Sequence, residues 1–134
     1  MSLSTFDDLL ASARAQDQPQ RLLFVFVAAG VPDDATPEQR ARFEAGQGGT
    51  LTPLMHVDKT PAELLSFAGL AEESAAFGAP WDIVFVAAMA GKDQVGPTPL
   101  DAEAPLLRMV ESIKSGRIGG FAAFDVNGQP VNFS

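Results

Sequence analysis

Cysteine and tyrosine are absent from this chain, and histidine occurs once, at His56. Without cysteine the protein has no disulfide, no thiolate ligand for a metal and no thiol nucleophile, which favours a cytoplasmic location. A transition-metal site normally takes several histidine or cysteine ligands, so we expect no bound metal. We likewise expect no cofactor, because no glycine-rich phosphate loop follows a predicted strand.

Positive charge and long apolar runs are also scarce. Nine Lys and Arg residues stand against 17 Asp and Glu residues, and the net charge of -8 argues against binding to nucleic acid or to an anionic membrane. No apolar run approaches the roughly 20 residues of a membrane-spanning helix. The first eight residues place no cationic segment before an apolar stretch, so we expect no secretory signal.

The segments that are present indicate a single α/β domain over residues 1–134. Residues 22–29 and 83–89 are continuously apolar and rich in Val and Phe, which is typical of central parallel strands covered on both faces. Each run follows a helix-like segment and precedes a Thr-Pro pair, a second helix and a second strand. This pattern predicts two helix-strand-helix-strand halves, about 4–58 and 60–126, related by a pseudo-twofold axis parallel to the strands.

Capping signals locate the predicted helices. The Thr-Pro pairs of 36–39 and 60–63 are each followed by a Gln or Glu that can complete a capping box. Pro105 is tolerated in the first turn of a helix, so the fourth helix is predicted to start near Asp101 or Ala102. Pro53 makes the strand 51–57 an edge strand or confines the proline to the strand entry.

The clearest hairpin signal is Asn127-Gly128, because these residues favour a type I′ turn. It predicts strands 121–126 and 129–133, the second antiparallel at the sheet edge. With both apolar strands central, we predict four mainly parallel strands in the order 2-1-3-4 plus this antiparallel hairpin strand. A thioredoxin-like or other four-to-five-stranded sandwich is the alternative.

In the predicted parallel sheet, strand order reverses between the first and third strands, so their carboxyl ends should form a crevice. The loops at that point carry Asp33, Asp34, Lys92 and Asp93, which we predict as contacts for a hard cation or polar ligand. The alternative is a solvated acidic loop beside helix N-termini, where Asp is favoured electrostatically.

His56 and Asp58 form a second possible polar site. Residues two apart in a strand share a face, so the Asp58 carboxylate could orient the imidazole of His56. No Gly-x-Ser-x-Gly nucleophile elbow accompanies them, and a structural role for His56 is the simpler interpretation.

Five stretches, at 6–10, 21–26, 37–43, 51–55 and 105–114, resemble a family of small uncharacterised bacterial proteins. Members of that family are sometimes labelled as the alpha subunit of ribonucleotide reductase. The radical chemistry of that enzyme requires several cysteines, so no active-site residue carries over to this chain and we do not expect that activity.

The sequence therefore favours a cytosolic, non-catalytic binding or protein-interaction module. The phenylalanine-rich terminal hairpin suggests a homodimer formed by pairing of edge strands. The alternatives are a small ligand- or nucleotide-binding enzyme that uses the crevice loops, and an accessory subunit of a larger enzyme.

Overall fold

The computed structural model describes residues 5–30, 36–44, 50–64, 66–75 and 80–131. The helices and strands, in chain order, are α1 (Phe6–Arg14), β1 (Gln20–Gly30), α2 (Pro37–Glu44), β2 (Thr50–Lys59), the one-turn 3-10 helix η1 (Pro61–Glu63), α3 (Phe67–Ala75), β3 (Ile83–Ala90), α4 (Pro99–Lys114) and β4 (Ala122–Asp125).

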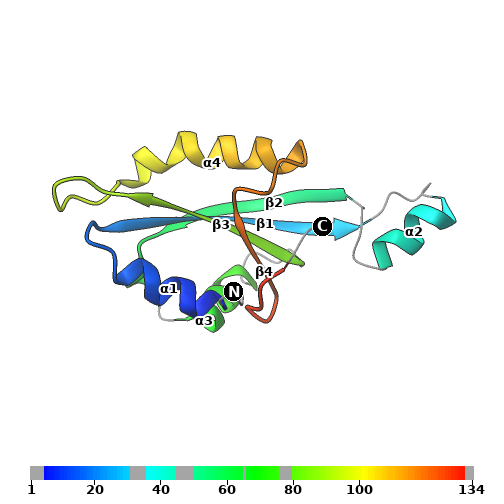
Figure 1. Ribbon diagram of the computed structural model, residues 1–134, viewed down its shortest axis with the longest axis horizontal. Helices are drawn as coiled ribbons and strands as arrows, with labels where there is room; N and C mark the ends of the chain where they lie inside the picture. Colours follow the sequence, from blue (N-terminus) through cyan, green and yellow to red (C-terminus); the bar gives the residue numbers. More distant parts are fainter. Residues whose placement is uncertain (1–4, 31–35, 45–49, 65, 76–79, 132–134) are drawn as a thin grey trace.

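The four strands form one sheet in the order β2-β1-β3-β4, and every neighbouring pair is antiparallel (Figure 1). The predicted order is therefore confirmed, whereas the predicted parallel direction is wrong. Helices cover both faces of the sheet, so Leu22–Val27 of β1 and Val84–Val86 of β3 are buried and apolar although the strands are antiparallel. This double burial produces the sequence pattern that is usual in parallel sheets.

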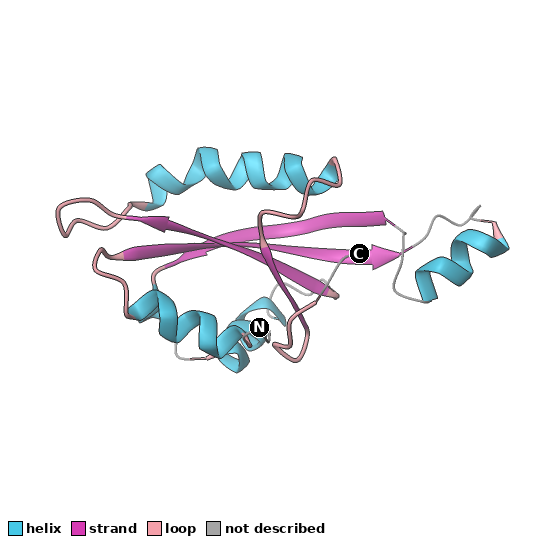
Figure 2. Ribbon diagram, in the orientation of Figure 1, coloured by secondary structure: helices cyan, strands magenta, loops and turns pink. Residues whose placement is uncertain are grey.

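The molecule has three layers, with α1 and α3 on one face of the sheet and α4 on the other (Figure 2). The predicted pseudo-twofold axis parallel to the strands is wrong, because it would place α1 and α3 on opposite faces and make β1 and β3 parallel. The helix α2 lies beyond the end of β1 and β2, apart from the layers (Figure 1).

Strand β1 separates the two halves of the core, because its successive side chains point to opposite faces of the sheet. Its even-numbered residues pack against α1 and α3, and its odd-numbered residues pack against α4. The α1/α3 side includes Phe6, Leu10, Leu22, Phe24, Phe26, Leu64, Phe67, Leu70, Val84, Val86 and Phe124. The α4 side includes Leu23, Val25, Val27, Phe85, Ala102, Leu106, Met109, Ile113 and Ala123.

Strand β2 is an edge strand, one of the two arrangements that Pro53 allowed. Its register with β1 shifts between Phe26 and Val27, leaving Leu54 as an extra residue on β2. The bulge reverses the alternation of β2, so Met55 faces α1 and α3 while Leu51 faces the α4 side. A bulge and a proline are both features that discourage a further strand from pairing with an edge.

Two predicted helix starts differ from the structure. The α4 helix begins at Pro99 after the N-cap Thr98, so Pro105 lies in its interior rather than in its first turn. The Thr60 capping box is present, but the helix it starts is the single turn η1. The chain becomes extended at Leu64, and α3 starts afresh at Phe67.

The predicted terminal hairpin is also changed. Only Gly128 has a positive φ (77°) in this turn, so the turn is not type I′. The N–H of Gly128 donates to the carbonyl of Asp125 at 3.1 Å, which is the pattern of a type I turn closed by a left-handed glycine. The returning arm is a single bridge between Phe124 and Pro130 in the described residues, and 132–134 lie outside them.

Candidate functional site

The predicted crevice between the first and third strands does not exist in an antiparallel sheet. Gln20 pairs with Ala90 at one end of the β1–β3 ladder, and Val27 pairs with Ile83 at the other. The loops that follow β1 and β3 therefore leave the sheet at opposite ends. Asp33 and Asp34 lie outside the described residues, and a ligand role for them stays a prediction.

Lys92 and Asp93 belong to a tight hairpin at the end of β3. The backbone N–H and C=O groups of Lys92 and Val95 bond each other in both directions at 2.9 Å. Asp93 and Gln94 have φ angles of 54° and 66°, so the type I′ geometry expected at 127–128 occurs here instead. The side chains of Lys92 and Asp93 are exposed, and their role as ligand contacts stays a prediction.

His56 and Asp58 both lie on the α4 side of β2, opposite Val25 and Leu23 of β1. Asp58 pairs with Arg21, whose Nη1 donates to the Asp58 carboxylate at 2.6 Å. The Nε of Arg21 donates to the carbonyl of Pro97 at 2.8 Å. Arg21 therefore connects the segment before α4 with the edge strand β2. The carboxylate of Asp58 orients the Arg21 guanidinium and not the imidazole of His56.

Among the described residues, two carboxylates have a shifted pKa, and both shifts come from helix capping. The backbone N–H of Thr60 donates to Glu63 at 2.9 Å and lowers the pKa of that carboxyl. The backbone N–H of Thr98 likewise donates to Asp101 at 2.9 Å and lowers its pKa. The hydrogen bonds that cause these shifts stabilise helix starts, and the shifts do not identify an acid or base for catalysis.

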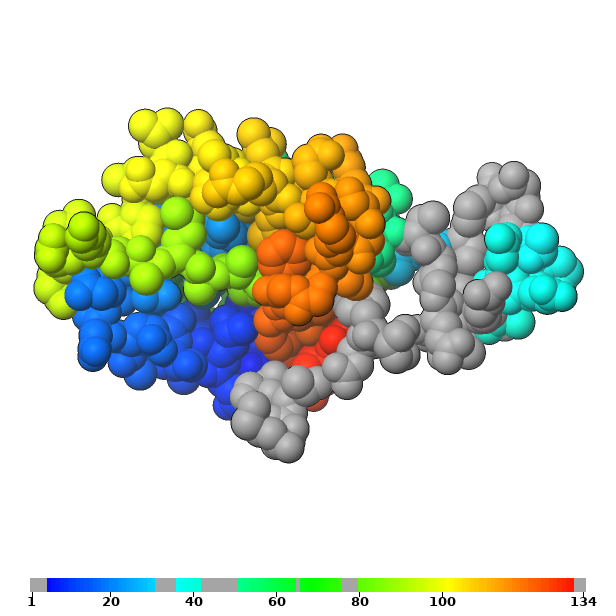
Figure 3. Space-filling view, turned by 45° about the horizontal axis from the view of Figure 1, so that its top comes forward, coloured from blue at the N-terminus to red at the C-terminus, as the bar shows by residue number. Residues whose placement is uncertain are grey.

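An open sheet edge is the most distinctive exposed feature of the described residues. The short strand β4 pairs only with Ile83–Val86, so the last four residues of β3, Ala87–Ala90, have no described strand beside them on that edge. Figure 3 shows the atoms of β3, in yellow-green, exposed between α4 in yellow and orange and α1 in blue.

The backbone groups of Ala88 and Ala90 point to this open edge. The N–H of Gly91 donates to the carbonyl of Pro19 at 2.8 Å, and this pair continues the β1–β3 register. Successive residues of a strand direct their N–H and C=O groups to alternate edges. The odd-numbered residues of this part of β3 therefore bond to β1, and Ala88 and Ala90 present one donor and one acceptor each to the open side.

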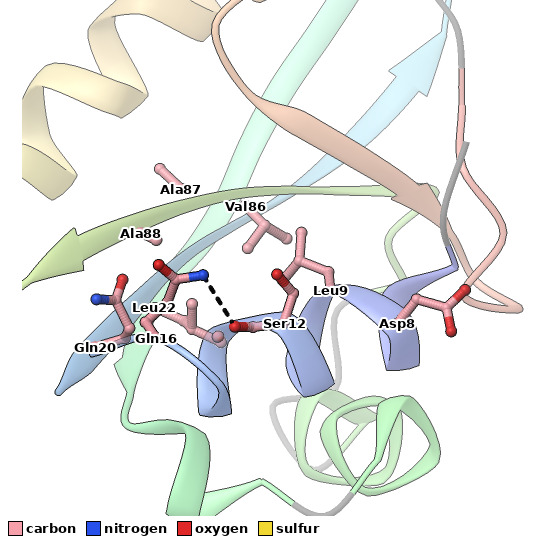
Figure 4. Close-up of a pocket in the computed structure, with 10 residues that line it drawn as sticks. Asp8, Leu9, Ser12, Gln16, Gln20, Leu22, Val86, Ala87 and Ala88 are labelled. Atoms are coloured by element: carbon pink, nitrogen blue, oxygen red, sulfur yellow. Dashed lines mark hydrogen bonds between the residues drawn. The ribbon is translucent and has the colours of Figure 1, made fainter. Parts of the chain in front are cut away.

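A groove of about 430 Å³ lies directly beside this edge, between α1 and β3 (Figure 4). Figure 4 shows the side chains of Leu9, Ser12 and Gln16 extending from α1 toward Val86 and Ala88 of β3. The full lining is Asp8, Leu9, Ser12, Ala13, Gln16, Gln20, Leu22, Val86, Ala87 and Ala88. We call this lining together with the backbone of Ala87–Ala90 the edge groove.

The edge groove presents several hydrogen-bond acceptors. The Nε2 of Gln16 donates to the Ser12 carbonyl at 3.2 Å, and the Nε2 of Gln20 donates to the Gln18 carbonyl at 3.0 Å. Each bond uses one of the two N–H groups of the amide, and the side-chain oxygens remain as acceptors. Asp8 adds a carboxylate, so the groove is suited to a partner that supplies donors.

Sequence reasoning missed this site because the run Val86–Met89 was interpreted as part of a fully buried strand. The available signal was its composition, since alanine is depleted in strands and three of the last four residues of β3 are alanine. Ala88 and Ala90 are exposed, whereas Val84–Val86 are buried. Small side chains leave the floor of the groove open.

Comparison of the chain with models of protein families, with curated proteins and with solved structures finds no match. The resemblance drawn from the sequence therefore stays a prediction. Within the described residues, no group of three or more His, Asp and Glu side chains is placed to hold a metal ion. No helix in the described part of the chain is long and apolar enough to cross a membrane.

Proposed function

We propose that this protein is a protein-interaction module that binds an extended peptide segment of a partner as an added strand beside β3. The observation that carries the proposal is the coincidence of an open strand edge, Ala87–Ala90, with a groove of about 430 Å³ along the same residues. In this recognition mode, main-chain hydrogen bonds provide affinity and adjacent pockets select alternate side chains.

The geometry suits such a strand. A segment entering beside Ala88 and Ala90 would continue the line of β4 and complete the edge that β4 leaves unfinished. Its alternate side chains would lie in the groove beside α1, and the others would lie toward Ala87 and Met89, which are half-buried on the α4 side. The other sheet edge, β2, is less suitable because it carries the Leu54 bulge and Pro53.

The enzyme alternative depended on a crevice shared by the loops after the first and third strands. Because β1 and β3 are antiparallel and end at opposite ends of the sheet, the geometry gives that alternative no support. A homodimer, which the sequence suggested through the terminal hairpin, would use this same open edge if β3 of two copies paired. Analytical ultracentrifugation distinguishes this arrangement from a bound peptide segment.

The proposal is tested with peptides selected from a random octapeptide library and with hydrogen–deuterium exchange. A bound strand is expected to slow exchange at the amides of Ala88 and Ala90. Ala88→Pro removes one of these donors and should abolish binding without unfolding the protein, since proline is tolerated where its missing N–H faces an open edge. Ala88→Trp should block the groove as well.

Ala104→Trp is the matched control, because Ala104 is also an exposed alanine but lies on α4, outside the groove. It should bind the selected peptides like the unmodified protein. The proposal is wrong if no library peptide binds, or if the bound peptides protect neither Ala88 nor Ala90 and still bind the Ala88→Pro variant.

A further inference from the structure

The one charged side chain among the described residues that line the groove beside α1 is acidic. Asp8 lines the groove from the first turn of α1, where its Oδ2 also accepts from the backbone N–H of Thr5 at 3.2 Å in the capping box. At the other end, the loop containing Asp17 is joined to the hairpin that carries Asp93, because Gln94 donates to the Asp17 carbonyl at 3.1 Å and to the Gln18 side chain at 2.8 Å. Asp8, Asp17 and Asp93 are all exposed, so acidic side chains frame both ends.

The described cations nearest to these elements are directed elsewhere. Arg14, the basic residue of α1, donates from Nη2 to the carbonyls of Pro61 and Leu64, on the side where η1 packs. Arg21 is buried against Asp58 and Pro97 on the α4 side of the sheet. Lys92 lines a neighbouring hollow between the end of β3 and the start of α4, which adjoins the edge groove at Met89 and Ala90 and also contains Asp101.

The groove therefore combines acidic charge with unused acceptors. Lysine and arginine side chains carry donors and no acceptors, so they complement the Asp8 carboxylate and the side-chain oxygens of Gln16 and Gln20. The small side chain of Ala88 leaves room for the long aliphatic stem of such a residue. On the opposite side of an added strand, Ala87 and Met89 offer half-buried apolar contacts instead.

Resting on the proposed function, we propose that the occupant is an extended segment of another protein that alternates basic and apolar residues. Its Lys or Arg side chains lie in the groove beside α1, and its apolar side chains lie toward the α4 side. A second copy of this chain fits less well, because each copy carries a net charge of -8 and would bring acidic groups against Asp8.

The test uses three fluorescently labelled octapeptides that alternate Val with Lys, Thr or Glu, measured by fluorescence anisotropy at low and high salt. The Lys/Val peptide is expected to bind about tenfold more tightly than the Thr/Val peptide, with the Glu/Val peptide weakest, and salt should reduce the difference. Asp8→Asn should weaken binding of the Lys/Val peptide about threefold, on the scale of one partly screened contact. Ala88→Pro should abolish it.

Glu111→Gln is the control for Asp8→Asn, since it removes one negative charge from the exposed face of α4 and should leave peptide affinity unchanged. One outcome is that the Lys/Val and Thr/Val peptides bind equally well to the unmodified protein and both fail to bind Ala88→Pro. This result would overturn the charge preference and leave the proposed function standing. Binding of the Lys/Val peptide that survives Ala88→Pro would show attachment elsewhere and overturn the inference.

The remaining outcomes are also decisive. Failure of all three peptides and of the random library would overturn the proposed function together with this inference. Self-association in analytical ultracentrifugation that is abolished by Ala88→Pro would identify a second copy as the occupant. That result would overturn the inference that the occupant is a basic segment of another protein. The edge groove would still be a docking surface.

Discussion

At the scale of single residues, Gly128 is a position where both the backbone conformation and the packing favour glycine. Its φ is 77°, and a Cβ added there would lie 3.0 Å from Cγ of the buried Phe67 ring. Gly128→Ala is therefore expected to lower the free energy of unfolding by about 1–3 kcal/mol, measured by urea denaturation. Gly119→Ala is the matched control, because its Cβ meets nothing within 4 Å, and an equal loss in both variants would contradict this reason.

Arg21 and Asp58 form the most enclosed ion pair in the described residues, with side-chain exposures of 11% and 23%. Asp58→Ala leaves the Arg21 guanidinium without its anion and is expected to cost about 2–3 kcal/mol of unfolding free energy, somewhat less than for a fully buried pair. Replacing both residues, as in R21M/D58L, should recover most of this loss. The prediction is checked by a double-mutant cycle in urea.

The Lys59–Glu73 pair is the comparison, because its Nζ–Oε1 distance is 2.5 Å but Glu73 is 43% exposed. Glu73→Gln should cost no more than about 1 kcal/mol, since solvent screens an exposed pair. If Asp58→Ala costs as little as Glu73→Gln, Arg21 does not depend on Asp58 for its placement and the assigned role of the pair is wrong.

At the scale of elements, the capping boxes make stability depend on pH. The pKa values of Glu63 and Asp101 are lowered from 4.5 and 3.8 by the N–H groups of Thr60 and Thr98. A carboxyl with a lowered folded pKa stabilises the fold above its unfolded pKa, and this stability is lost as the pH falls through the folded pKa. The thermal midpoint should therefore fall as the pH is lowered below about 5.

The variant E63Q/D101N should flatten this decline, because neither capping side chain titrates. The variant E72Q/E103Q removes the same charge from exposed positions outside the caps and serves as the control. A decline as steep in E63Q/D101N as in the unmodified protein would show that other carboxyls set the acid sensitivity.

The same elements show which parts of the fold were accessible from sequence. The strand order was predictable because the two most apolar strands had to be central. In the structure these two strands, β1 and β3, do occupy the centre of the sheet. The direction of the strands was not predictable, because helices on both faces bury an antiparallel strand as completely as a parallel one. This error placed the loops after β1 and β3 together and produced the predicted crevice.

The candidate site was harder to predict because it depends on the length of β4. The predicted strand 121–126 would have covered more of the β3 edge, whereas the observed strand has four residues and reaches only to Val86.

The role of Arg21 was also missed. A charged residue before an apolar run is usually a strand boundary, and only the register with β2 brings it to Asp58.

At the scale of the whole molecule, the three-layer core should fold without the segment that joins β1 to β2. Gly30 pairs directly with Thr50, so the intervening nineteen residues, 31–49, are an insertion in a hairpin. The described side chains of this segment, 36–41, are all exposed, and α2 lies apart from the layers (Figure 1). Replacing 31–49 by Asn-Gly provides the turn that a two-residue hairpin prefers.

The shortened chain is expected to keep its circular dichroism spectrum and to unfold cooperatively. It should gain up to about 2 kcal/mol, because closing a two-residue loop costs less entropy than closing one of nineteen. It should also bind the Lys/Val peptide unchanged, since the edge groove lies at the opposite end of β1 from Gly30. Loss of cooperative unfolding would mean that 31–49 belongs to the core. Loss of peptide binding alone would mean that the segment contributes to the site, and Asp33 and Asp34 would then be the first residues to substitute.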